Sequence, residues 1–188
     1  MERFRRFLSR HPRAYRVWFA VLSWLGHRRI PLLRAKLNTL WGMISIQGCL
    51  SIVNPGDIIA VRSYRFLTSY LIPGRYSHSV VYTGGGFVIH AVSPRVCEEK
   101  LERFLLEYDG FILLRPRGIY DWKKADREAF LNLKIGYDFS FAPDNKESYC
   151  HELSAKVIEK GTGRKVPIKG DRYTWNDIAA VCDVVMEV

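Results

Sequence analysis

The sequence predicts an α+β domain in which helices pack against an antiparallel sheet or a small barrel, preceded by an N-terminal helical arm. Short β-rich runs separated by turns begin near Ile52, and segments with apolar residues at helical spacing lie between and after them. The chain has 188 residues, of which 48% are hydrophobic and 26% charged, as in a folded domain rather than a disordered segment.

The positive charge is concentrated near the N-terminus. The formal net charge is +10, but residues 1–45 contain ten Lys or Arg and the single acid Glu2. Residues 46–188 are almost neutral, with nineteen basic and eighteen acidic residues. The charge therefore divides the chain into a basic, aromatic helical arm, residues 1–45, and a main domain, residues 46–188. A nucleic-acid partner is not expected for the main domain, because it carries no excess of positive charge.

The arm is predicted to form helices with an apolar side and a basic side. Pro12 divides the first helix, and a second helix is expected from Leu32 to about Trp41. The apolar run from Val17 to Leu25 has nine residues, whereas a spanning helix needs about 20, so it does not cross a bilayer. No cleavable signal peptide is expected, because Gly26 to Arg29 do not resemble a cleavage site.

Two roles for residues 1–45 remain open. They can lie in the membrane interface with Arg side chains toward lipid phosphates, or pack on the main domain or in a dimer contact. Binding to nucleic acid ranks third. The oligomeric state is open, and a cytoplasmic or peripheral membrane location is favoured over any compartment that requires a signal.

The cysteine pattern predicts neither a disulfide framework nor a metal site. The four cysteines are Cys49, Cys97, Cys150 and Cys182. None forms a CxxC pair, and their wide spacing suits reduced thiols. Cys150, His78 and His90 are all zinc-competent, but no fourth ligand is evident, so no metal or other cofactor is expected.

Each element of the main domain follows from a local signal. Turn residues bound the apolar β-rich runs, and apolar residues at three- and four-residue steps mark helices. The strands are expected at residues 58–61, 79–82, 87–92, shortly after Pro94, and at 111–114. The helices are expected at residues 64–72, 98–107, 125–133, 150–160 and 174–180, the fourth ending at Gly161. Three glycines in Thr83 to Gly86 suit a tight hairpin turn that pairs Tyr82 with Phe87.

Cys150 is the candidate nucleophile. It opens a predicted helix, where unpaired backbone N–H groups and the positive end of the helix dipole favour the thiolate. The same N–H groups can hold an oxyanion. A lone cysteine is more often a small buried hydrophobe, and this interpretation is kept for the other three.

His78 and His90 are the candidate partners of Cys150. His78 begins an apolar strand, a rigid position that suits a general base, and His90 lies on the partner strand of the hairpin. The hairpin brings the two histidines nearly opposite, so one imidazole can hold the other in a single tautomer. Taken singly, each histidine is more often a buried side chain without a catalytic role.

Five short motifs occur in a distinctive order. They are Pro55-Gly56-Asp57-Ile58-Ile59, Tyr76-Ser77-His78, Phe87-Val88-Ile89-His90-Ala91, Tyr137-Asp138-Phe139-Ser140-Phe141 and Tyr149-Cys150-His151-Glu152-Leu153. Together they resemble the circularly permuted branch of the NlpC-type, papain-like cysteine hydrolase superfamily, over roughly residues 52–182. That branch contains YiiX-like proteins and lecithin:retinol acyltransferase-like enzymes, and in it the histidine strand precedes the cysteine helix.

The resemblance implies a Cys-His-His triad. Cys150 is implied as nucleophile, His78 as general base and acid, and His90 as the residue that orients His78. The residues implied to shape the substrate site are Tyr149, Tyr137, Asp138 and Ser77. Two positions depart from the family pattern, His151 where Ser is common and Ser79 where Gly or Val is expected.

The function expected from these residues is a thiol hydrolase or acyltransferase acting on an amide or ester. The substrate classes that the resemblance implies are peptides, cell-wall peptides and lipid acyl groups, and residues 1–45 favour a lipid or membrane-associated substrate. The alternative is a non-catalytic lipid- or peptide-binding module on the same fold.

Overall fold

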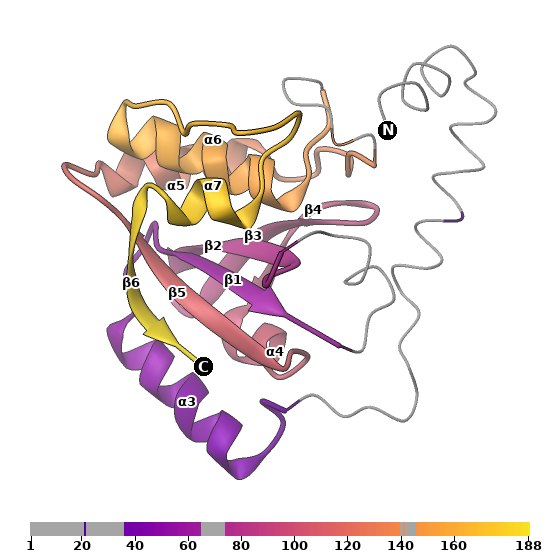
Figure 1. The fold of residues 1–188 in the computed structure, drawn as a ribbon, viewed down its shortest axis with the longest axis vertical. Helices are drawn as coiled ribbons and strands as arrows, with labels where there is room; N and C mark the ends of the chain where they lie inside the picture. Colours follow the sequence, from indigo (N-terminus) through magenta and orange to yellow (C-terminus); the bar gives the residue numbers. More distant parts are fainter. Residues whose placement is uncertain (1–20, 22–35, 65–73, 140, 142–145) are drawn as a thin grey trace.

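The centre of the fold is a six-stranded antiparallel sheet with strand order β4-β3-β2-β1-β5-β6 (Figure 1). The computed structural model describes residues 21, 36–64, 74–139, 141 and 146–188. Within these residues the sheet is open, with β4 and β6 at its edges, and does not close into the small barrel that was the other expectation. The strands are β1 (Ile58–Arg62), β2 (His78–Gly84), β3 (Phe87–Val92), β4 (Arg95–Lys100), β5 (Gly110–Pro116) and β6 (Cys182–Glu187).

Helices cover both faces of the sheet (Figure 1). One face carries α5 (Trp122–Leu131), α6 (Cys150–Thr162) and α7 (Trp175–Ala179). The other carries α3 (Leu40–Ile52) and α4 (Leu101–Leu105). The α+β class predicted from the sequence is therefore confirmed.

The sheet separates two apolar layers, which explains why its central strands are almost continuously apolar. In β1, Ile58 and Ala60 face α6, whereas Ile59 and Val61 face α3 and α4. Successive side chains of a strand point to opposite faces, so a helix on each face buries the whole strand.

A half-buried ion pair ties Asp57 to β5, and a tyrosine fixes the sheet relative to α6. Asp57, which is 2% exposed, accepts hydrogen bonds from Arg115 Nε and Nη2 at 2.9 and 2.7 Å. Tyr120 donates to the carbonyl of Gly56 at 3.1 Å and packs against Gly161 of α6, where any Cβ would overlap its ring. Gly161 is therefore required inside α6. The helix ends at Thr162 and is capped by Gly163, which adopts a left-handed φ of 69°. The predicted end at Gly161 is corrected accordingly.

The helix predicted to end near Trp41 instead begins at that point. Residues 36–39 form turns and bends, and the Thr39 hydroxyl caps α3 by accepting a hydrogen bond from the Gly42 N–H at 3.2 Å. Helix α3 crosses the predicted boundary at residue 45, and the division of the chain there remains a prediction. The predictions for residues 1–35, Val21 excepted, and for 65–72 lie outside the described residues.

Strand β6 and the start of α4 were not predicted. β6 pairs with β5 at the edge of the sheet. Residues 98–100 continue β4, so the helix expected from residue 98 begins only at Leu101. None of the described helices is both long and apolar enough to span a bilayer.

Candidate active site

A β-bulge in the β2–β3 hairpin places His78 and His90 on the same face of the sheet. Val81 pairs with Ile89 and Tyr82 with Val88, but Gly84 pairs with Phe87, so β2 contains one extra residue. The predicted pairing of Tyr82 with Phe87 is therefore wrong by one position. That pairing would have put His90 opposite Ser79 and turned the two histidine side chains to opposite faces, because a one-residue slip reverses every side chain.

The two histidine rings are in contact over Phe104 of α4. His78 Nε2 lies 3.0 Å from His90 Nδ1, and the ring centroids are 5.3 Å apart. Phe104 packs against both rings, with centroids 5.9 Å from His78 and 5.2 Å from His90. The hairpin prediction that the two histidines come together is consistent with this distance, and Phe104 restricts how either ring can turn.

Strand β4 places two further side chains beside His90. In β4, Cys97 pairs with His90 and its Sγ lies 3.4 Å from His90 Nε2, while Glu99 Oε2 lies 3.7 Å from the same nitrogen. Sequence reasoning interpreted Cys97 as structural and did not single out Glu99. Across the short turn at Pro94, His90 pairs with Cys97 and Val88 pairs with Glu99. Counting residues outward from that turn would have indicated that Cys97 and Glu99 lie beside His90.

One choice of tautomer for each histidine satisfies these contacts. If His90 Nε2–H donates toward Cys97 and Glu99, then His90 Nδ1 carries the lone pair and accepts from His78 Nε2–H. The lone pair of His78 is then on Nδ1, the ring nitrogen that does not contact His90. His78 is thereby prepared to accept a proton at Nδ1.

Both histidines are neutral at physiological pH. Burial, followed by the nearby His90 and His151, lowers the pKa of His78 well below its usual range. Burial alone lowers the pKa of His90 to about 4. A neutral imidazole can act as a base, whereas an imidazolium cannot.

Cys150 is the first residue of α6, as predicted, and is 2% exposed. The backbone N–H groups of Ser79, His151 and Cys150 itself lower the pKa of the thiol, but burial outweighs them and raises it to about 11. The amides at the helix start favour the thiolate, as expected, but the expectation of a low net pKa is wrong, because desolvation costs the anion more than three amide dipoles return.

The first turn of α6 lies beside the end of β2 that carries His78. His78 and Ser79 are adjacent, and the backbone N–H of Ser79 interacts with the Cys150 sulfur. His151, in the first turn of α6, is close enough to His78 to lower its pKa. Among the described residues no hydrogen bond joins Cys150 Sγ to the His78 ring. The resting pair is thus a neutral thiol and a neutral imidazole.

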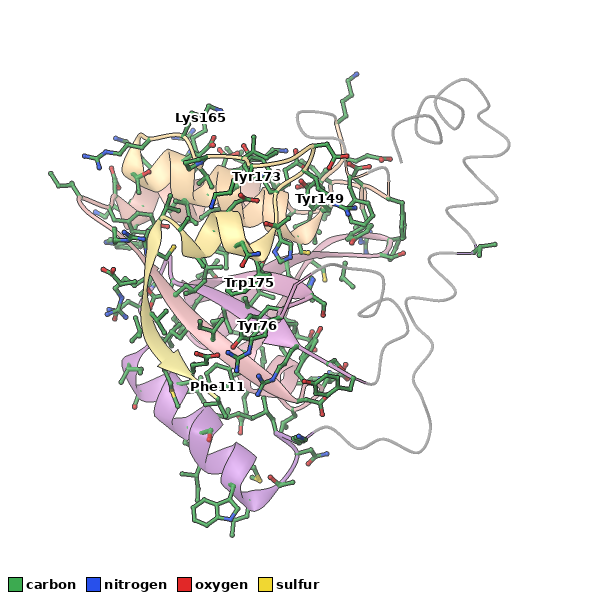
Figure 2. All side chains as sticks on the ribbon, in the orientation of Figure 1. Tyr76, Phe111, Tyr149, Lys165, Tyr173 and Trp175 are labelled. Carbon is green, nitrogen blue, oxygen red and sulfur yellow. The ribbon has the colours of Figure 1, made fainter. Side chains whose placement is uncertain are left out.

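The four residues expected to shape the substrate site differ in exposure. Tyr149 is 1% exposed, and its hydroxyl accepts a hydrogen bond from the Tyr173 N–H at 2.6 Å (Figure 2). Asp138 is 0% exposed and Ser77 is 7% exposed. Tyr137 is partly exposed, and burial, followed by nearby Cys150, raises its pKa well above its usual range. Tyr137 is the member of this set that combines exposure with proximity to Cys150.

His151 belongs to a buried polar chain beside the site. Its Nδ1 lies 2.9 Å from Ser79 Oγ, which lies 2.9 Å from Ser154 Oγ, and Ser154 donates to the carbonyl of Cys150 at 3.2 Å. Because the Ser154 hydroxyl donates its proton to the Cys150 carbonyl, its oxygen accepts from the Ser79 hydroxyl. The Ser79 oxygen in turn accepts from His151 Nδ1–H. This chain explains both departures from the family pattern, because His151 and Ser79 bond each other and fix the first turn of α6 to β2.

We expect the variant His151→Ser to lose less stability on acidification than the wild type. Burial, opposed by Asp177, lowers the pKa of His151 to about 4, whereas an unfolded histidine titrates near 6.5. Between these values the unfolded chain binds the proton and the folded chain does not, so stability falls as pH falls. Each such group contributes about 1.4 kcal/mol per pH unit.

The measurement is the free energy of unfolding by urea from pH 6.5 down to pH 4 in both proteins. The comparison uses the slope with pH, so a constant destabilisation of the variant does not affect it. Equal slopes would show that His151 is protonated in the fold or exposed to solvent.

Comparisons with known proteins agree with this fold. A family model described as "permuted papain-like amidase enzyme, YaeF/YiiX, C92 family" matches residues 52–170, well over half of the chain. A solved structure described as the metalloprotein yiiX from Escherichia coli O157:H7 is similar with a TM-score of 0.53 and 24% identity. The match covers 61% of this chain and 69% of that one, and it supports the fold alone. No curated protein matches the chain.

A histidine strand ahead of a cysteine helix, on an open antiparallel sheet, defines the permuted papain-like class of hydrolase folds. The chain belongs to the YaeF/YiiX, C92 family of permuted papain-like amidases. The resemblance seen in the sequence is confirmed at this level. Among the described residues, no group of three or more His, Cys, Asp or Glu side chains is arranged to hold a metal ion.

Proposed function

We propose that this chain is a cysteine-dependent amidase or esterase in which Cys150 is the nucleophile, His78 the general base and acid, and His90 the residue that orients His78. The observation that carries the proposal is the 3.0 Å contact between His78 Nε2 and His90 Nδ1. With His90 protonated on Nε2, it leaves His78 Nδ1 as the basic nitrogen, and it provides the third member that a Cys-His pair requires.

The reaction begins from the neutral pair. Substrate binding displaces water from the site, and His78 Nδ1 takes the proton of the Cys150 thiol as the sulfur attacks the carbonyl carbon. The carbonyl electrons move to oxygen, where N–H groups at the start of α6 stabilise the negative charge. Because the thiol pKa is raised to about 11, proton transfer accompanies attack rather than preceding it.

The second half regenerates the enzyme. The tetrahedral intermediate collapses, the C–N or C–O bond breaks, and the leaving amine or alcohol takes the proton from His78. Water then loses a proton to His78 as its oxygen attacks the thioester, and the acid departs as the sulfur regains the proton. An alcohol or amine acceptor in place of water would make the same chemistry an acyl transfer.

The acyl group is proposed to belong to a peptide, a cell-wall peptide or a lipid. The test is release of leaving groups from matched amide and ester panels that carry peptide or fatty acyl groups, with the full chain. Turnover that stops on alkylation of Cys150 supports the proposal. Turnover that survives the alkylation, or a complete absence of turnover on every panel, contradicts it.

A non-catalytic binding module is the second candidate. The observation that favours it is the burial of Cys150, which is 2% exposed and has a raised pKa. In that case the same acyl compounds bind without turnover, and Cys150→Ala binds them as well as the wild type does.

We expect Glu99→Gln to weaken the reaction by disturbing His90. A glutamine keeps the size of the side chain but can turn its NH2 group toward His90 Nε2, which favours the opposite tautomer and removes the basic lone pair from His78 Nδ1. The expected loss is roughly tenfold in kcat with little change in KM.

The matched control is Glu102→Gln, which changes an exposed glutamate on α4. The acid limb of the pH profile should move in Glu99→Gln alone. If both variants behave alike, Glu99 has no part in orienting the histidine pair.

A further inference from the structure

Helix α3 is apolar on two opposite faces, and one of them is uncovered in the described structure. Its inner face packs beneath the sheet, with Ile46 and Cys49 1% and 0% exposed. The outer face contains residues 40, 41, 43, 44, 47, 48, 51 and 52. Its large exposed side chains are Leu40 at 73%, Trp41 at 78%, Met43 at 50%, Ile44 at 55% and Ile52 at 41%. A helix that is apolar all round normally has partners all round.

The outer face of α3 is also free of charge. The sequence has no Lys, Arg, Asp or Glu between Lys36 and Asp57. The polar side chains of the outer face, Gln47 and Ser51, are neutral, and exposed Trp41 is of the residue type that prefers the boundary between lipid and water. This composition suits a surface that is partly buried in an apolar medium.

The basic residues that precede α3 in the sequence indicate which apolar medium covers its outer face. Residues 1–36 contain ten Lys or Arg, and no acidic residue occurs between Glu2 and Asp57. A second copy docked on this face would bring two such basic segments together, which electrostatic repulsion opposes. An anionic lipid surface attracts the basic segment and accepts the apolar side chains at the same time.

We propose that the outer face of α3 docks on an anionic membrane surface, with Trp41 and Ile44 entering the headgroup region. Helix α3 has 13 residues, or about 20 Å, so it lies along the surface. It also lies on the opposite side of the sheet from α6 (Figure 1), so docking leaves the helix that begins with Cys150 uncovered. The proposal does not depend on the catalytic one.

The experiment is sedimentation of the full chain with phosphatidylcholine vesicles, with and without phosphatidylglycerol. The variant is Trp41→Ser with Ile44→Ser, and the matched control is Ile119→Ser with Leu131→Ser, two exposed apolar residues 95% and 65% exposed outside α3. The wild type and the control should bind the anionic vesicles equally. The α3 variant should bind at least about tenfold more weakly, because it loses two inserting side chains.

Three results would overturn the proposal. The first is equal binding by the α3 variant and the wild type, which would assign binding to the basic segment alone. The second is a wild type that does not bind anionic vesicles. The third is an α3 variant that changes from dimer to monomer in light scattering while its vesicle binding is unchanged, which would assign the face to a second copy.

Discussion

Cys150→Ala is expected to lower kcat/KM by about a thousandfold or more on any amide or ester that the wild type hydrolyses. Alanine cannot form the thioester, so the loss should fall on kcat and leave substrate binding nearly intact. The helix start is preserved, since Tyr149 remains the N-cap and alanine favours helix. The measurement is steady-state kinetics of both proteins on the same substrate.

Cys49→Ala is the matched control. Cys49 is 0% exposed inside α3, on the other face of the sheet, and burial raises its pKa to about 12. It should retain wild-type kcat/KM. If Cys49→Ala and Cys150→Ala lose equal activity, the loss reflects packing rather than a nucleophile.

His78→Gln is expected to reduce kcat by roughly 10²- to 10⁴-fold. Glutamine fills a similar space beside Phe104 but cannot take the thiol proton, and a thiol whose pKa is about 11 cannot ionise by itself near neutrality. The loss should shrink at high pH, where solvent removes the proton instead. The measurement is kcat at increasing pH up to the limit of stability.

The pH profile of the wild type gives a second readout of the same residue. Because the pKa of His78 lies well below 6.5, the base is already neutral at pH 6.5, and activity should be lost only as pH falls further. An acid limb centred at or above pH 6.5 would contradict the burial of His78. His151→Ser, which removes a neighbouring buried histidine, should lose far less activity than His78→Gln.

Local sequence signals were enough to predict the class of fold and the elements that carry the candidate site. The position of Cys150 at a helix start follows from the turn-forming loop before it and the apolar stripe after it. The hairpin that carries His78 and His90 follows from two apolar runs and a turn with three glycines. Such signals depend on a few neighbouring residues, so they can be recognised without tertiary structure.

The parts that were missed depend on contacts between distant residues. The bulge between Tyr82 and Gly84 is set by how β2 pairs with β3, and the three glycines of the turn permit a bulge without fixing its position. Edge strand β6 has exposed and half-buried residues without a clear apolar alternation. The raised pKa of Cys150 results from burial under the assembled fold, which a helix-start argument does not include.

Glu99 shows the same limit at the site itself. It lies in a strand in which four of the six residues are charged, where a solvent-exposed face is the ordinary interpretation. Its position beside His90 became apparent only when the register of β3 and β4 was known. Working out the pairing of β3 with β4 from the sequence would have predicted that Glu99 lies near His90.

The most direct measurement is mass spectrometry of the full chain quenched in acid shortly after mixing with an activated acyl ester. The account predicts one acyl group bound as a thioester to the peptide that contains Cys150, formed quickly in the wild type and slowly in His78→Gln. An acyl group on Cys49, Cys97 or Cys182 instead, or equal rates of acylation in the two proteins, would contradict it.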